Sequence, residues 1–138
     1  MVEIIPGVRV YDLKIIPTEN GFVRHGIKNT DSDYNKFGEM YFSVVKSGRI
    51  NGWKLHKTNS CNIIVTCGEI LFYFKLAAKG SKITELVAGP ETRHVRIAID
   101  PGVYFAFRGL GKGSSVLLNF MNGLHDRHET ESIKFQDI

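Results

Sequence analysis

Residues 94–108 read HVRIAIDPGVYFAFR, and this stretch predicts two short strands around a tight turn. Apolar residues recur at every second position from Val95 to Ile99, which is the pattern of a strand with one buried face. Asp100-Pro101-Gly102 then supplies the residue types that a tight turn requires. A second run, Tyr104 to Arg108, is rich in the aromatic residues that favour strands.

Short runs of this kind recur along the whole chain. We find no long segment with helical periodicity, and only Asp31 to Lys36 has the character of a helical turn. The predicted strands are Val8 to Ile16, Gly21 to Lys28, Met40 to Lys46, Ile50 to His56, Asn62 to Thr66, Glu69 to Leu76, Ile83 to Val87, His94 to Ile99, Tyr104 to Arg108 and Val116 to Asn122. Many short strands at even spacing predict an all-β sandwich or barrel.

Length and composition favour one folded domain over residues 1–138. Apolar residues make up 43% of the chain and charged residues 23%, which is the balance of a globular protein. The formal charge of +4 is mild and is not concentrated in one basic run. We therefore expect a phosphorylated small molecule, and no nucleic acid, as the anionic partner.

The sequence has no feature of a membrane or secreted protein. Its longest apolar stretch, Ile63 to Leu76, is interrupted by Glu69 and Lys75 and cannot cross a bilayer as a helix. The segment that begins at Met1 lacks the basic region, apolar core and cleavage site of a signal peptide. We predict a cytoplasmic protein without a membrane partner.

Two cysteines, Cys61 and Cys67, lie in one predicted strand. In an extended strand they are roughly 20 Å apart, which is too far for a disulfide. We interpret both as small buried groups without a redox role.

A family resemblance covers the chain from about Val8 to Asn122. It rests on residues 37–45 (FGEMYFSVV), 52–57 (GWKLHK), 67–70 (CGEI) and 99–107 (IDPGVYFAF). These segments resemble the short branch of the dTDP-4-dehydrorhamnose 3,5-epimerase family, which runs G-W-H-x-H, then a Gly-turn hairpin, then I-P-P-G-V-x-H-G-F. The resemblance implies a jelly-roll-like cupin β-barrel, commonly dimeric, that holds a nucleotide-linked 4-keto-6-deoxy sugar inside the barrel. It also implies a place in surface polysaccharide biosynthesis.

The family's chemistry needs three groups, and this chain departs from the pattern at each. A His removes a proton beside the ketone, a Lys holds the enolate oxygen and a Tyr is the acid. The position of the base is Lys54 here, and the second His of the motif is His56. The position of the enolate Lys is Asn62, and the segment that carries the family's Tyr, residues 119–124, contains none.

From this resemblance we predict Lys54 and His56 as catalytic residues, because alternate residues of a strand share one face. The predicted substrate-binding residues are Trp53, Asn62, Tyr104 and Asn119. An acid could come from Tyr41, Tyr73 or Tyr104, none of which is at the family's position.

No metal and no cofactor are expected. Metal-binding cupins resemble one another in an H-x-H motif, a nearby Glu and a later His, and first-row metals need several such ligands converging. Here Lys54 and Phe105 occupy two of those positions, and only His56 is left as a ligand.

Two functions fit these residues. The first is a divergent metal-free isomerase or epimerase that acts on a nucleotide-linked 4-keto-6-deoxy sugar. The second is a catalytically silent cupin that binds a sugar nucleotide or a partner enzyme, since three catalytic groups of the family are missing together. We favour the first, and we predict a homodimer because an exposed edge strand needs a cover.

Overall fold

The computed structural model describes residues 1–137 of the chain, and it is built almost entirely of strands. Within these residues there are thirteen strands, one short 3-10 turn and no α-helix. The elements are β1 (Val2–Ile5), β2 (Val8–Asp12), β3 (Ile15–Thr18), β4 (Gly21–Arg24), β5 (Glu39–Val45), β6 (Trp53–His56), β7 (Cys61–Cys67), β8 (Glu69–Leu76), β9 (Thr84–Ala88), β10 (Val95–Ile99), β11 (Val103–Leu110), β12 (Ser115–Met121), β13 (Thr130–Ile133) and the 3-10 turn η1 (Phe135–Asp137). The all-β prediction is confirmed.

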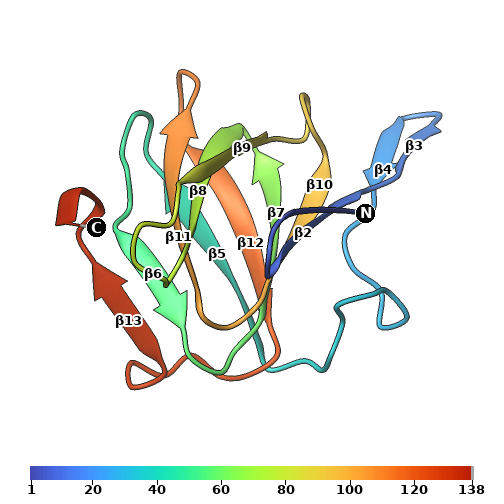
Figure 1. The fold of residues 1–138 in the computed structure, drawn as a ribbon. Helices are drawn as coiled ribbons and strands as arrows, with labels where there is room; N and C mark the ends of the chain where they lie inside the picture. Colours follow the sequence, from blue (N-terminus) through green and yellow to red (C-terminus); the bar gives the residue numbers. More distant parts are fainter. Residues whose placement is uncertain (138) are drawn as a thin grey trace.

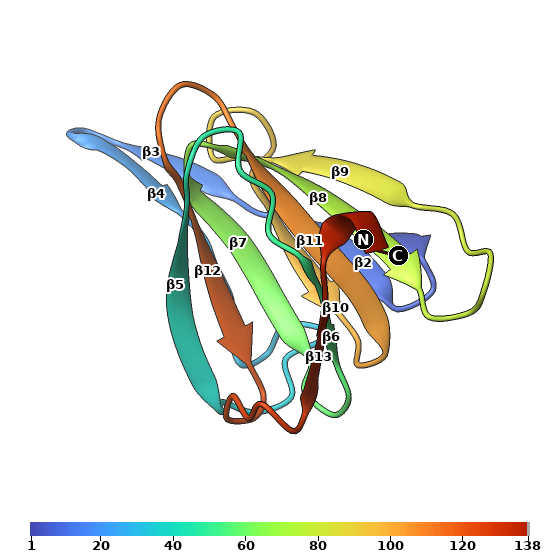
Figure 2. The ribbon, with the colours of Figure 1, turned by 90° about the vertical axis from the view of Figure 1, so that its left-hand side faces the viewer.

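Two antiparallel sheets face each other and form a barrel (Figure 1; Figure 2 gives the view at 90°). The first sheet has the strand order β1-β2-β10-β7-β12-β5, and the second has the order β13-β6-β11-β8-β9. The hairpin β3–β4 pairs with neither sheet and projects from the barrel (Figure 1). Strand β5 is an edge strand of the first sheet, and β6 belongs to the second sheet. Residues of these two strands can therefore line a site between the sheets.

The turn at residues 100–102 carries the chain from the first sheet to the second. It joins β10 to β11, so the two strands predicted around it lie in opposite walls of the barrel. Gly102 has a φ of 86°, a left-handed conformation that only glycine adopts at little cost. The Gly in this turn is therefore required by the backbone geometry.

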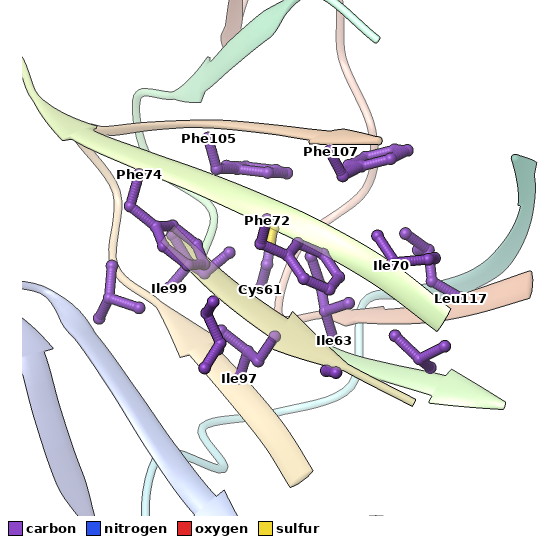
Figure 3. Packing of buried hydrophobic residues seen from close by; sticks show 14 of the residues in the cluster. Cys61, Ile63, Ile70, Phe72, Phe74, Ile97, Ile99, Phe105, Phe107 and Leu117 are labelled. Atoms are coloured by element: carbon purple, nitrogen blue, oxygen red, sulfur yellow. The ribbon is translucent and has the colours of Figure 1, made fainter. Parts of the chain in front are cut away.

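The apolar core lies between the two sheets. Alternate residues point inward from each strand, so that aromatic rings of β8 and β11 meet aliphatic side chains of β7, β10 and β12 (Figure 3). The inward residues include Phe72, Phe74, Phe105 and Phe107 from one sheet and Ile63, Ile97, Ile99 and Leu117 from the other. This packing fixes which face of every strand lines the barrel.

Several predicted elements differ in the structure. The run Val8 to Ile16 divides into β2 and β3, which belong to different sheets. Asp31 to Lys36 forms turns and bends, and Asp33 has a left-handed φ of 66° that interrupts any helix. The strands β1 and β13 were not predicted from the sequence. Within residues 1–137, no helix has the length and apolar character that a membrane crossing needs.

Candidate active site inside the barrel

The strand β6 directs Lys54 and His56 into the barrel. Lys54 is paired with Phe105 of β11, and Phe105 belongs to the core between the sheets. Paired residues of neighbouring strands share a face, so Lys54 points inward, and His56 does the same two positions later. The imidazole of His56 stacks on the ring of Phe105, with 6.0 Å between the centroids. The shared face that the sequence predicted for Lys54 and His56 is present.

His56 forms a pair with a carboxylate that the sequence analysis missed. Its Nδ1 atom lies 2.8 Å from Oε2 of Glu129, and the His56 side chain is only 2% exposed. The other oxygen of Glu129 accepts hydrogen bonds from the backbone amides of Asn59, at 2.8 Å, and Thr58, at 3.0 Å. The Thr130 hydroxyl also lies within hydrogen-bond distance of Oε2, at 3.1 Å, so four groups surround the Glu129 carboxylate.

The hydrogen bonds around Glu129 determine its charge and the tautomer of His56. Burial raises the pKa of the Glu129 carboxyl, but hydrogen bonds from Asn59, His56 and Thr58 outweigh burial and lower this pKa to about 2. An ionised carboxylate can only accept, so the Nδ1 atom of a neutral His56 carries the proton. The lone pair is then on Nε2, which is buried and has no partner among the described residues. This is the arrangement of a base that is ready to accept a proton.

Lys54 lies between an inner cavity and the opening of the barrel. The inner cavity has a volume of about 70 Å³, and its walls combine apolar side chains, among them Phe105, Phe107 and Leu117, with polar ones such as Ser43 and Asn119. The outer recess has a volume of about 270 Å³ and is lined by Glu39, Tyr41, Lys54 and His125. Lys54 and Tyr41 line both spaces, and Lys54 makes no ion pair with a described carboxylate. Its ammonium is free to bind a ligand at the boundary.

Asn119 and Tyr41 supply polar groups on the opposite wall. The Asn119 amide donates to the Tyr41 hydroxyl at 3.3 Å and to the Cys61 sulfur at 3.6 Å, while its own oxygen is buried without a partner. Burial raises the pKa of Tyr41, and the bond from Asn119 opposes this only in part. Burial likewise raises the pKa of Cys61 to about 12. Tyr41 therefore stays a protonated donor, and Cys61 stays a thiol and not a nucleophilic thiolate.

Three predicted substrate-binding residues lie outside this cavity. Trp53 and Tyr104 are on the outer face of the second sheet, in a cluster with Tyr73 and Phe135. Asn62 lies between the inward residues of β7, on the outer face of the first sheet, where it bonds the carbonyl of Asp33 and the guanidinium of Arg96. The reason is strand alternation. Trp53, Asn62 and Tyr104 are each next in sequence to a residue that points inward, so their own side chains point outward. Of the four predicted ligand contacts, only Asn119 is in the cavity.

Tyr41 carried a signal in the sequence, whereas Glu129 did not. Tyr41 was one of three candidate acids, and it is the one of the three that lines the cavity. Glu129 immediately precedes β13, in a polar segment without strand periodicity, and it reaches His56 through a pairing of strands distant in sequence. A single sequence holds no local sign of that pairing.

No group of three or more His, Cys, Asp or Glu residues that could hold a metal occurs within residues 1–137. The expectation of a metal-free site stays a prediction.

The barrel has the fold of the RmlC-like cupins. No protein-family model matches the chain, and no curated protein matches it, but solved structures do. A dTDP-sugar isomerase from Desulfovibrio desulfuricans G20 is similar with a TM-score of 0.89 and 24% identity, over 95% of this chain and 86% of that chain. The dTDP-6-deoxy-D-glucose-3,5-epimerase RmlC from Legionella pneumophila Philadelphia 1, in complex with dTDP-4-keto-L-rhamnose, has a TM-score of 0.84 and 17% identity, over 98% and 77%.

A third similar structure has a different stated activity. QdtA from Thermoanaerobacterium thermosaccharolyticum, a sugar 3,4-ketoisomerase in complex with TDP, has a TM-score of 0.73 and 21% identity, over 91% of this chain and 87% of that chain. At these identities the likeness establishes the fold. The comparison therefore confirms the predicted resemblance to epimerase-type cupins as a resemblance of fold.

Proposed function

We propose that this protein is an isomerase or epimerase that acts, without a metal, on a nucleotide-linked 4-keto-6-deoxy sugar in surface polysaccharide biosynthesis. The observation that carries the proposal is the His56–Glu129 pair, in which the carboxylate lies on Nδ1 and the buried Nε2 atom has no partner among the described residues. The stated activities of the similar structures, sugar isomerases and an epimerase with dTDP-type ligands, support the choice of substrate class.

The proposed reaction begins with proton removal at a carbon beside the ketone. His56 Nε2 accepts this proton, and the electron pair moves to the ketone oxygen. Lys54 is two residues away on the same face, so its ammonium can donate a hydrogen bond to the enolate oxygen where the negative charge develops. The proton returns to carbon from His56 or, from the other wall, from the Tyr41 hydroxyl. Asn119 holds Tyr41 in place through its amide.

The size of the cavity limits how much of the substrate enters. The inner space of about 70 Å³ is well below the roughly 300–1,000 Å³ of ordinary ligand pockets. The outer recess is close to the lower end of that range. His56 lines neither space directly. We therefore place the reacting edge of the sugar at Lys54 and the rest of the ligand in the recess, and the Tyr41 side chain must move for the sugar to reach His56.

A catalytically silent binding module is the second candidate, and the same small cavity favours it. A barrel whose interior is nearly filled by Phe105, Phe107 and Leu117 can retain the recess as a binding surface after it has lost the chemistry. In that function Lys54 and Tyr41 contact a ligand and His56 performs no proton transfer.

Incubation in deuterated water with dTDP-4-keto-6-deoxyglucose separates the two functions. An isomerase or epimerase washes deuterium into the carbons next to the ketone, and we expect His56→Gln to slow this by at least about 100-fold. His128→Gln is the matched control, because His128 is exposed and its side chain is outside the site. Measurable binding of several keto-sugar nucleotides without any wash-in would reject the isomerase and leave the binding module.

A homodimer is part of the proposal, and the exposed apolar side chains support it. The outer face of β5 shows Met40, Phe42 and Val44, next to Phe37, and the projecting hairpin shows Ile15, Ile16, Phe22 and Val23. Val44 is 67% exposed, and the other seven residues are 44–62% exposed. Together they leave on the order of 800 Å² of apolar surface, which is what each partner contributes to a standard interface. We propose that a second copy covers this surface.

A further inference from the structure

The segment that carries Glu129 is attached to the barrel at its two ends. Strand β13 is a four-residue edge strand that pairs with β6, with Thr130 opposite His56 and Ile133 opposite Trp53. A short edge strand is a weak anchor by itself. Leu124, at the start of the segment, is 72% exposed and adds little packing. The start of the segment is held by hydrogen bonds, from the Asn59 side-chain amide to the Leu124 carbonyl at 3.0 Å and from the His125 backbone amide to Glu39 at 2.8 Å. The far end needs a contact of its own.

An aromatic contact holds the far end. The indole of Trp53, which is fully buried, lies parallel to the ring of Phe135, with 5.2 Å between centroids and 6° between planes. The indole N–H donates to the backbone carbonyl of Phe135 at 3.1 Å. Tyr73 packs against both rings, with its ring centroid 4.9 Å from that of Phe135 and 6.4 Å from that of Trp53. We call these three residues the aromatic clasp.

The clasp and the His56–Glu129 pair are on opposite faces of the same short strand. Trp53 and His56 are the two ends of β6, so the clasp fixes one end of β13 while Glu129 lies at the other. Gly52, just before β6, shows how closely β13 approaches, because a Cβ there would lie 2.7 Å from the carbonyl oxygen of Ile133. Loss of the Phe135 contact, or a steric clash between a side chain at position 52 and Ile133, would therefore displace the same strand, β13.

We infer that Phe135 is a positioning residue for His56: by closing on Trp53 it keeps β13 against β6, and so keeps the Glu129 carboxylate on Nδ1 and the lone pair of Nε2 in the barrel. This inference rests on the proposed role of His56 as the base. When β13 separates from β6, Nδ1 loses its acceptor, and the proton of a neutral imidazole can then lie on either nitrogen. An imidazole protonated on Nε2 has no lone pair to offer the substrate.

The test measures the tautomer of His56 and needs no substrate. In protein labelled with 15N-histidine, two-bond nitrogen–proton spectra at neutral pH distinguish the Nδ1–H form from the Nε2–H form. We expect the Nδ1–H form in the unmodified protein and a mixture in Phe135→Ala. Amide hydrogen exchange of Lys57, which donates to the Glu129 carbonyl at 2.7 Å, should become at least about tenfold faster, because the opening costs less free energy.

Three further variants separate positioning from a general loss of stability. Phe135→Tyr keeps the ring and should restore the Nδ1–H form. Gly52→Ala leaves every clasp residue intact but pushes on β13, and it should produce the same mixture as Phe135→Ala. Phe22→Ala removes an exposed ring from the projecting hairpin and should change neither measurement.

Each result decides the question. A pure Nδ1–H signal with unchanged exchange at Lys57 in both Phe135→Ala and Gly52→Ala would overturn the inference. If Phe135→Ala does not fold, Gly52→Ala and hydrogen exchange of the unmodified protein decide the question. In the unmodified protein the amides of Lys57 and of β13 must exchange with the same free energy of opening. Different free energies of opening would overturn the inference. A protein that shows the tautomer change but no deuterium wash-in would contradict the proposed function and leave the positioning role intact.

Discussion

The Nδ1 atom of His56 lies 2.8 Å from the carboxylate of Glu129, although 73 positions separate the two residues in the chain. The second carboxylate oxygen is bound by the amides of Thr58 and Asn59, which lie two and three residues after His56. One carboxylate thus joins the loop after β6 to the segment before β13. The imidazole is oriented by the protein before any ligand binds.

Glu129→Gln should lower kcat for the proposed reaction by roughly 10- to 1,000-fold, because a neutral amide no longer fixes the proton on Nδ1 or stabilises a protonated imidazole. KM for the sugar nucleotide should change little, since Glu129 does not line the cavity. Steady-state kinetics of Glu129→Gln and the exposed control Glu131→Gln check this. Equal activity of the two variants would contradict the role of Glu129.

The stability of the protein should fall at acid pH because of Glu129. Its pKa is lowered from 4.5 to about 2 in the folded protein, so its contribution is fully present above pH 4.5 and is lost as pH falls towards 2. The full shift corresponds to about 3 kcal/mol, and solvent screening reduces the contribution below that figure. Urea unfolding between pH 7 and pH 2.5 measures it. In Glu129→Gln the free energy of unfolding should depend less on pH over that interval, whereas Glu131→Gln should retain the full dependence.

Tyr41→Phe should lower kcat by about 10- to 100-fold if the hydroxyl returns the proton. The change in folding stability should be about 1 kcal/mol, because the hydroxyl accepts one long hydrogen bond from Asn119, at 3.3 Å, and donates only a weak one to the Met121 sulfur, at 3.9 Å. Thermal unfolding and deuterium wash-in measure the two effects separately. Wash-in that equals the unmodified rate, with the product still formed, would assign the returned proton to His56 alone.

Trp53→Ala should lower the free energy of unfolding by about 3–5 kcal/mol, as expected for a fully buried aromatic residue. Trp53→Phe keeps part of the packing and should fold. Because Trp53 is on the outer face of its sheet, the Kd of Trp53→Phe for dTDP should equal that of the unmodified protein. Isothermal titration measures this, and a tenfold weaker Kd would show that the indole contacts the ligand after all.

A charge on the outer face of β5 should prevent dimer formation. We expect a dimer at micromolar concentration in the unmodified protein and a monomer in Phe42→Glu, since the substitution places a charge in the proposed interface. Ile83→Glu is the control, because Ile83 is also exposed but precedes β9 in the other sheet. Sedimentation velocity distinguishes the species. A monodisperse monomer of the unmodified protein would contradict the proposed interface.

Local alternation predicted the strands well and the faces only in part. The shared face of Lys54 and His56 follows directly from strand geometry, and it is present. Residues 61–65, in contrast, are buried on both faces, so no alternation of polar and apolar residues shows that Asn62 points away from Cys61 and Ile63. Tyr104 has the same problem beside Phe105, because both faces of β11 carry aromatic residues.

Long-range pairing explains what the sequence could not predict. Strand β13 is short and polar, and it is a strand because β6 offers it an unpaired edge and Trp53 offers it an apolar surface. The place of Glu129 depends on that pairing. The division of Val8 to Ile16 has a similar cause, since β2 is recruited by β10 while β3 pairs only with β4.

The order of strands in the two sheets also has a consequence for folding kinetics. Strands β8, β9 and β11 are near one another in the chain, and β8 pairs with both of the others. In contrast, the pairs β2–β10, β5–β12 and β6–β13 join strands that are far apart in the chain. Distant pairings require closure of long loops and form slowly, on a scale of milliseconds to seconds. A nucleus of β8, β9 and β11 would therefore precede the rest of the barrel. The acid–base pair, which depends on one of the most distant contacts, would be among the last features to mature.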